Sequence, residues 1–200
     1  MGEVAGLGHA GTEAPVDPFG AALVLDVDVV EQSLVLVRPL ADRKGLQIRA
    51  QGHSAPIELH TDPRKLRQIL VNVLANAVKF TDTGDVRLFF HVEGEADEAV
   101  VTMYFEVTDT GPGMSLLDQE HIFEPFWQAD PMSTNSSGST GLGLSVARQL
   151  ARLLGGDVFV TRSVIGEGST FVVSLPARYA GGAAGVRNES AVHLFTAMSP

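Results

Sequence analysis

The segment from Asp62 to Phe80 constrains the fold more than any other part of the sequence. Asp62 followed by Pro63 is typical of a helix start, because aspartate caps free N–H groups and proline fits the first helical position. Apolar residues then recur at helical spacing up to Phe80. They cluster on one face, which must pack against another layer of the protein. That face consists of Leu66, Ile69, Leu70, Val73, Ala77 and Phe80.

The same helix carries a polar stripe of Asn72, Asn76 and Lys79. Such a stripe is usually the solvent side of an amphipathic helix, but that side normally carries Glu, Lys, Gln and Arg, which form helices better than asparagine. Amide oxygens are suitable neutral ligands for Mg²⁺, which keeps several waters and shares its coordination with phosphates. Lys79, one turn beyond Asn76, could then reach those phosphates. A solvent-facing stripe and a magnesium-phosphate face both remain open.

Composition and charge exclude several functions. The 200 residues are 44% hydrophobic and 19% charged, as expected for one globular domain. A net charge of -10 argues against nucleic acid as a partner. Without cysteine there are no disulfides, thiolate metal sites or cysteine nucleophiles, which fits an intracellular protein. No apolar run approaches the roughly 20 residues of a membrane span, and no signal peptide is evident, so we expect a cytoplasmic segment without membrane contact.

The chain divides into a folded domain with two flanking segments. Residues 1–22 are rich in glycine and proline and are expected to be a linker or disordered, and residues 179–200 are expected to be a flexible tail. In between, helices and strands are mixed with hairpins rather than in regular βαβ alternation, which predicts an α+β two-layer α/β sandwich. Helices are expected over 29–40, 62–80, 116–122 and 141–154, and strands over 46–50, 86–92, 100–108, 157–161 and 169–175.

Two glycine-containing segments carry further candidate ligand-binding groups. "VTDTGPGM" (Val107 to Met114) places Asp109 at a strand end, and "GSTGLGL" (Gly138 to Leu144) opens into a helix. Both are compatible with ordinary loops. Alternatively, Asp109 could accept a hydrogen bond from an exocyclic amine such as that of adenine, and the N–H groups at the helix start could hold phosphate oxygens.

Together, the segments resemble the catalytic and ATP-binding domain of two-component sensor histidine kinases. "NVLANAVKF" resembles the N box of that family, "DTGPGM" the G1 box, "IFEPFWQAD" the F box and "GSTGLGL" the G2 box, while "GEGSTFVVSLP" resembles its last β-hairpin. The resemblance covers roughly Leu23 to Pro176. It implies the Bergerat fold, with a mixed and mostly antiparallel sheet.

The resemblance also implies ATP and Mg²⁺ as cofactors and gives roles to individual residues. Asn76 would hold Mg²⁺, Lys79 would contact phosphate, Asp109 would bind adenine, and Asn72 would support the phosphate site. Asn72, Asn76 and Lys79 are the implied catalytic residues. The family also has a mobile lid, here the segment from Trp127 to Thr140. The remaining implied binding residues are Gly111 and Gly113 in the base pocket, Phe123 and Phe126 as anchors of the lid, Thr140, Gly141, Leu142, Gly143 and Leu144 in the phosphate loop, and Thr170 near the adenine.

The activity implied is transfer of the ATP γ-phosphate to a histidine for two-component phosphorelay. Asn72 stands where hydrolysing relatives have a glutamate base, which favours transfer over hydrolysis. None of the six histidines has the context of the family's acceptor, so we expect the acceptor on a dimerisation or phosphotransfer domain, with a response regulator as an indirect partner. Both an excised domain and a stand-alone module fit, and the isolated domain is expected to be monomeric.

The sequence departs from the family pattern in its lid. From Trp127 to Thr140 there is no Lys or Arg, whereas many relatives have a basic residue there, and Ser139 stands where glycine is usual. The lid composition predicts a segment that is mobile without nucleotide. Two alternatives stay open: a serine kinase of the anti-sigma-factor type on the same fold, and a degenerate adaptor that uses the fold for protein contacts.

Overall fold

A computed structural model gives the structure of the chain and describes residues 23–24, 28–53, 57–59, 61–94, 100–128, 140–179 and 192–195. The expected linker over 1–22 and nearly all of the expected mobile lid lie outside these residues. None of the helices in the described ranges is long and apolar enough to cross a membrane. The helices are α1 (Asp28–Lys44), α2 (Pro63–Phe80), α3 (Leu116–His121) and α4 (Gly143–Leu153). The strands are β1 (Leu23–Val24), β2 (Gln47–His53), β3 (Ile57–Leu59), β4 (Asp85–Glu93), β5 (Val101–Asp109), β6 (Asp157–Val164), β7 (Gly168–Tyr179) and β8 (Val192–Phe195).

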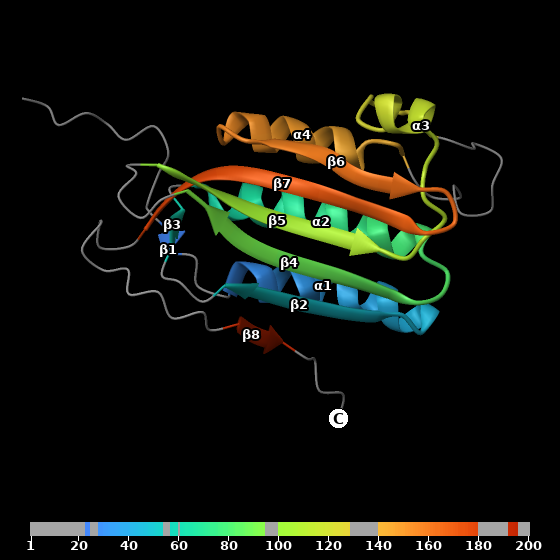
Figure 1. The fold of residues 1–200 in the computed structure, drawn as a ribbon, viewed down its shortest axis with the longest axis horizontal. Helices are drawn as coiled ribbons and strands as arrows, with labels where there is room; N and C mark the ends of the chain where they lie inside the picture. The colour runs from blue at the N-terminus through green and yellow to red at the C-terminus, as the bar shows by residue number, and fades with distance from the viewer. Residues whose placement is uncertain are drawn as a thin grey trace, which may run out of the picture.

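The strands form a twisted sheet against which α1, α2 and α4 pack (Figure 1). The strand order is β1-β3-β7-β5-β4-β2-β8, and β6 pairs with residues 168–174 of β7 on the edge opposite β5, beside the part of that edge that pairs with β3. Only β2 and β4 run parallel among the described pairs; the other pairs are antiparallel. This confirms the predicted α+β two-layer sandwich with a mixed, mostly antiparallel sheet.

Helix α2 lies at the centre of the core, as its apolar spacing predicts. Asp62 caps its start, because Oδ1 accepts hydrogen bonds from the N–H groups of Arg64 (2.9 Å) and Lys65 (3.3 Å). The prediction that Phe80 lies in the core was wrong, because Phe80 ends the helix and is 38% exposed. The Lys79 ammonium lies 4.7 Å from the centroid of its ring. The buried residues of α2 are Leu66, Ile69, Leu70, Val73, Leu74, Ala77 and Val78.

The sequence predicts neither β3 nor β8. Strand β3 pairs with the end of β7, and β8 pairs antiparallel with β2, with Ala50 opposite Phe195. Strand β8 falls in the segment expected to be a flexible tail, which differs from that expectation. The physical reason is that β2 would otherwise present an unpaired edge of N–H and C=O groups, to which even a short strand can pair.

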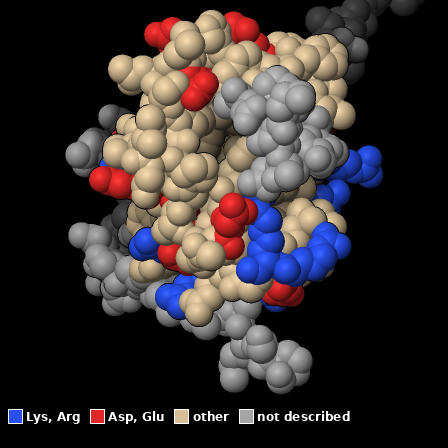
Figure 2. All heavy atoms as spheres, turned by 90° about the vertical axis from the view of Figure 1, so that its right-hand side faces the viewer, with Lys and Arg blue, Asp and Glu red and all other residues tan. Residues whose placement is uncertain are grey.

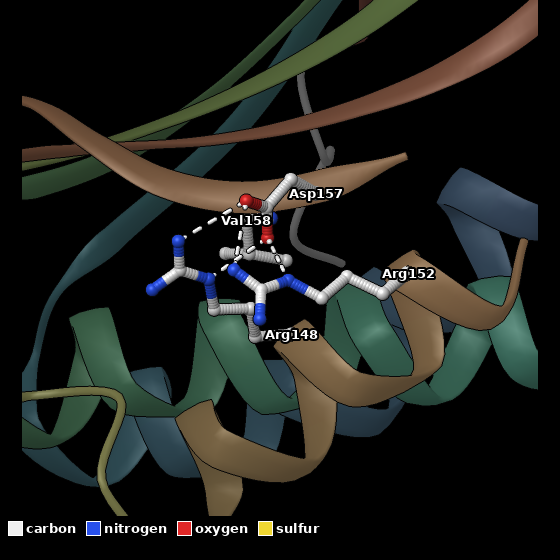
Figure 3. Close-up of polar contacts among 4 residues, drawn as sticks. All are labelled: Arg148, Arg152, Asp157 and Val158. Atoms are coloured by element: carbon white, nitrogen blue, oxygen red, sulfur yellow. Dashed lines mark hydrogen bonds and ion pairs between the residues drawn. The ribbon is translucent and has the colours of Figure 1, made fainter. Parts of the chain in front are cut away.

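A charged cluster connects α4 to the start of β6. The guanidinium of Arg148 donates to both oxygens of Asp157 (2.8 and 3.1 Å), and Arg152 does the same at 3.2 and 3.3 Å (Figure 3). Burial alone would raise the pKa of Asp157, but the hydrogen bonds from Arg148, Arg152 and the Val158 N–H outweigh it and lower the pKa to about 2. The two arginines therefore favour the ionised carboxylate of the folded state.

We expect Asp157→Asn to lower the free energy of unfolding at pH 7 by about 1–2 kcal/mol, less than the full pKa shift because the carboxylate is one-third exposed. The pKa of the carboxylate is lower in the folded state than its ordinary value of 3.8. Its contribution to the free energy of unfolding is therefore complete above about pH 5 and is lost as pH falls through about 2. Urea unfolding of both proteins between pH 7 and pH 3 measures this. A difference that stays constant over that range would contradict the assignment.

Candidate functional site

The predicted site segments meet at one end of the molecule. Strand β5 ends there at Asp109, and β7 begins there after the turn that follows β6 (Figure 1). The last turn of α2 and the first turn of α4 lie at the same end (Figure 1). Helices α2 and α4 pack against each other, so the polar stripe of α2 and the glycine-rich start of α4 belong to the same end of the fold. The topology thus brings together segments more than 60 residues apart in the chain.

Asp109 is the buried carboxylate at this end. It is 5% exposed, and its Oδ1 accepts hydrogen bonds from the N–H groups of Gly111 (2.9 Å) and Ser169 (3.3 Å). Burial raises its pKa, and the two N–H groups oppose that rise. Both contacts go to Oδ1, which leaves Oδ2 without a hydrogen bond from the described residues. Oδ2 is therefore the oxygen that can accept from an amine of a bound base.

The loop after Asp109 packs so closely that its glycines have no space for a side chain. A Cβ on Gly111 would lie 2.9 Å from Asp109 Oδ1 and 3.0 Å from the Phe80 carbonyl oxygen. Gly113 has a φ of +67°, and a Cβ there would lie 2.0 Å from the Val164 carbonyl oxygen. The loop is thus pressed between the end of α2 and the β6–β7 turn.

Hydrogen bonds fasten the same loop to β6 and β7. The Met114 N–H donates to Ser163 Oγ (2.8 Å), and Ser163 Oγ lies 2.9 Å from Ser169 Oγ. The Gly166 N–H donates to the Pro112 carbonyl (2.7 Å). The β6–β7 hairpin is therefore fixed directly against the loop that follows Asp109.

Thr170 does not share a face with Asp109, contrary to the expectation that it lies near the adenine. Its Oγ1 lies 3.1 Å from Oγ1 of Thr108, and these half-buried threonines point to the face of the sheet opposite the core. Ser169, which lies opposite Asp109 in the pairing of β5 with β7, is buried and faces the core side of the sheet instead. The period-two alternation of β7 could have shown this, because Phe171 is a core residue and Ser169 lies two residues before it.

The polar stripe of α2 is half-buried rather than fully solvated. The Oδ1 atom of Asn72 accepts a hydrogen bond from Gln68 Nε2 (2.8 Å), and Asn76 lies one turn further along. The Lys79 ammonium is buried and finds no hydrogen-bond partner among the described residues. Burial, followed by the charge of Lys44, lowers the pKa of Lys79. An unpaired buried ammonium is costly, so an anionic group is the expected partner.

The start of α4 lacks a side-chain cap from its own N-cap residue. Leu142 at the N-cap supplies no side-chain hydrogen bond, and Gly143, the first residue of the helix, has open space around the position of a Cβ. Gly141 has a φ of +67°, and a Cβ there would lie 2.7 Å from the backbone of Phe126. The free N–H groups of a helix N-terminus suit phosphate oxygens. Of the neighbouring predicted residues, Leu144 is buried in the core and Thr140 is exposed.

The two phenylalanines expected to anchor the lid behave differently. The Phe123 ring packs edge-on against Phe171 at 6.5 Å and lies under the Arg148 guanidinium at 4.7 Å. Phe126 is 72% exposed with a φ of +67°, so most of its side chain lies outside the core, and its role as a lid anchor stays a prediction because most of the segment 127–140 lies outside the described residues. Its N–H instead donates to the Gly141 carbonyl (3.0 Å). The two ends of the segment 127–140 are therefore joined through the backbone.

Figure 2 looks onto this end of the molecule and shows Lys and Arg atoms mainly in the lower half of the face. No cluster of three or more His, Cys, Asp or Glu side chains suited to a metal ion occurs among the described residues. A metal here would instead use amide oxygen, water and phosphate, which is coordination that Mg²⁺ accepts. A pocket between α3 and α4, lined by Phe123, Ser145 and Arg148 among others, includes neither Asp109 nor any residue of α2 and is separate from the candidate site.

We expect Gly113→Ala to lower the free energy of unfolding more than Gly45→Ala. Both glycines have a φ of +67°, so both substitutions carry the same backbone strain, but a Cβ on Gly45 meets no atom within 4 Å. The close approach to Val164 should add about 1–3 kcal/mol at Gly113. Denaturant unfolding of the two variants measures the difference. Equal losses would show that the loop moves away from the hairpin without cost.

Comparison with known proteins identifies the family. Residues 61–179 match the family described as histidine kinase-, DNA gyrase B- and HSP90-like ATPase. The autoinducer 2 sensor kinase/phosphatase LuxQ of Vibrio parahaemolyticus is 40% identical over 148 residues, covering 72% of this chain and 17% of that protein. The circadian input-output histidine kinase CikA of Synechococcus elongatus is 44% identical over 115 residues, covering 58% of this chain and 14% of CikA. The chain thus spans less than a fifth of these relatives.

Solved structures agree in fold. Full-length ShkA in complex with AMPPNP superposes with a TM-score of 0.66 at 31% identity, covering 82% of this chain and 32% of ShkA. The mycobacterial sensor histidine kinase MprB has a TM-score of 0.62 at 22% identity, covering 80% of this chain and 99% of that structure, which shows the fold alone. The chain therefore belongs to the histidine kinase-, DNA gyrase B- and HSP90-like ATPase family, as an ATPase domain of the histidine kinase type.

Proposed function

We propose that residues 23–178 form a domain that binds Mg-ATP and presents the γ-phosphate to a histidine on a separate dimerisation domain. The observation that carries this proposal is the buried ammonium of Lys79 on the polar stripe of α2, which has no hydrogen-bond partner in the part of the chain that the structure describes. In a family of ATP-binding domains, a phosphate group is the anion that would satisfy this charge. Asp109, at the same end of the fold, would accept a hydrogen bond from the adenine amine through Oδ2.

The residues present fit a bound magnesium ion. Asn76 would supply one neutral oxygen ligand, Lys79 would contact the phosphates, and the N–H groups at the start of α4 would hold their oxygens. The ion would neutralise phosphate charge during transfer. Asn72 cannot act as a base on water, because an amide does not accept a proton at neutral pH. The domain therefore favours transfer over hydrolysis.

Transfer would form a bond between an imidazole nitrogen and the γ-phosphorus while the bond to the bridging oxygen breaks and ADP leaves. The domain contributes position and charge neutralisation rather than covalent chemistry. ShkA, described in complex with AMPPNP, supports nucleotide binding by this fold. We place the reaction in the cytoplasm, where ATP is available, with a response regulator receiving the phosphoryl group from the histidine and with this domain monomeric when isolated.

A degenerate adaptor remains a second candidate on one observation: residues 127–140 contain no Lys or Arg that could approach the γ-phosphate. Burying Asp109 and Lys79 without complete hydrogen bonding costs free energy unless a ligand supplies the missing partners. An adaptor that binds no nucleotide would have no ligand to offset that cost. The two candidates therefore differ in whether the chain binds nucleotide at all.

We expect calorimetric titration to show saturable binding of a non-hydrolysable Mg-ATP analogue, weakened roughly 10- to 100-fold by Asp109→Asn. An asparagine can keep its oxygen on the Gly111 and Ser169 N–H groups, but its amide then turns a donor toward the adenine amine. Asp85→Asn is the matched control, because Asp85 lies at the same end of the sheet and pairs with Arg87. No binding by the unsubstituted chain would favour the adaptor.

We expect phosphoryl transfer to yield phosphohistidine. The chain would be incubated with Mg-ATP and a histidine-containing dimerisation domain, and the product tested for stability to acid and alkali. An acid-labile, alkali-stable product that requires Mg²⁺ supports the proposal. An acid-stable product identified as phosphoserine would assign the chain to the serine kinase alternative instead.

A further inference from the structure

Lys44, the last residue of α1, reaches across to the end of α2. Its ammonium donates to the carbonyl oxygens of Lys79 (2.5 Å) and Thr81 (3.0 Å), and it contacts Oδ1 of Asp82 at 3.2 Å. These acceptors lie 35 to 38 residues further along the chain. All three donor positions of the ammonium are therefore directed at the segment that ends α2.

The position matters because the C-terminal end of a helix is unfavourable for phosphate. The last carbonyl groups of a helix have no partner within it and carry negative partial charge. Asn76 and Lys79 both lie in the final turns of α2, so phosphates bound to them would face this end. Lys44 covers two of these carbonyls and partly neutralises the carboxylate of Asp82.

Lys44 also acts on Lys79 through space. After burial, the charge of Lys44 is the second cause of the lowered pKa of Lys79. Asp82 contacts Lys44, whereas no ion pair joins Lys79 to a carboxylate among the described residues. Two neighbouring ammonium groups repel each other until an anion binds between or beside them.

We propose that Lys44 is a positioning residue for the polyphosphate of ATP: it neutralises the carbonyl end of α2 and holds Lys79 where it meets the phosphates. This inference rests on the proposed function, because it requires that the chain binds nucleotide. It adds a residue outside the part that matches the family, which begins at residue 61. The role is electrostatic, so it depends on the charge of the side chain rather than on its packing.

The test compares adenosine, ADP and a non-hydrolysable ATP analogue in calorimetric titrations at low salt. Lys44→Met removes the charge and keeps most of the stem. We expect unchanged adenosine affinity, a small loss for ADP and a roughly tenfold loss for the ATP analogue, with the loss shrinking as salt is raised. Lys44→Arg should keep ATP affinity within about threefold, because it preserves the charge.

Lys65→Met is the matched control. Lys65 also pairs with an aspartate, Asp62, but at the opposite end of α2, and it makes no contact with the candidate site. We expect its affinities for all three ligands to equal those of the unsubstituted chain. Urea unfolding of each variant confirms that the compared proteins are folded under the titration conditions.

The outcomes separate the two proposals. No nucleotide binding by the unsubstituted chain would refute the proposed function itself. Normal binding by the unsubstituted chain together with equal affinities in Lys44→Met would refute only the role of Lys44. An equal loss for adenosine and ATP would also refute it, because it would show a structural effect on the whole pocket rather than an effect on phosphate.

Discussion

Two backbone N–H groups that converge on one oxygen of Asp109 hold the candidate site together. A buried carboxylate needs such donors, and here they come from Gly111, just after β5, and Ser169, near the start of β7. This requirement brings the loop after β5 against the β6–β7 hairpin, so closely that Gly113 has no room for a Cβ beside Val164. The positions of the loop and the hairpin are thus linked through a single buried carboxylate.

Features with a local signal could be predicted from the sequence. Helix α2 begins at an Asp-Pro cap and repeats apolar residues at helical spacing, and the structure has it over the predicted range. Asp109 and the glycines after it were identifiable because their residue types restrict the backbone and the chemistry. The order of helices and strands was enough to predict the sandwich.

Features that depend on distant contacts could not be predicted in this way. The pairing of β8 with β2 is decided by an edge more than 130 residues away, and four residues carry too weak a pattern to show it. Thr170 is a different case, because its prediction followed the family resemblance and did not use the period-two alternation of β7, which puts Ser169 on the inner face. The exposed side chain of Phe126 and the contacts of Lys44 likewise depend on where neighbouring segments lie.

The charge arrangement bears on how an acidic chain could hold the proposed phosphate site. With a net charge of -10, the chain as a whole repels anions. Lys44 and Lys79 come from two different helices and place positive charge at the end of α2, in contrast to the negative charge of the whole chain. The first of these helices precedes residue 61, where the family match begins, so the electrostatics of the proposed site extend beyond that match.

The hydrogen bond between Ser169 and Asp109 joins residues 60 positions apart, and this separation has a consequence for folding order. Pairing of β4 with β5 is local and can form early, whereas β7 pairs with β5 only after the chain has passed through α3, α4 and β6. Until then Asp109 has only the donor of Gly111. We therefore expect the surroundings of Asp109 to be completed late in folding, and a ligand that binds there to stabilise the completed fold rather than an intermediate.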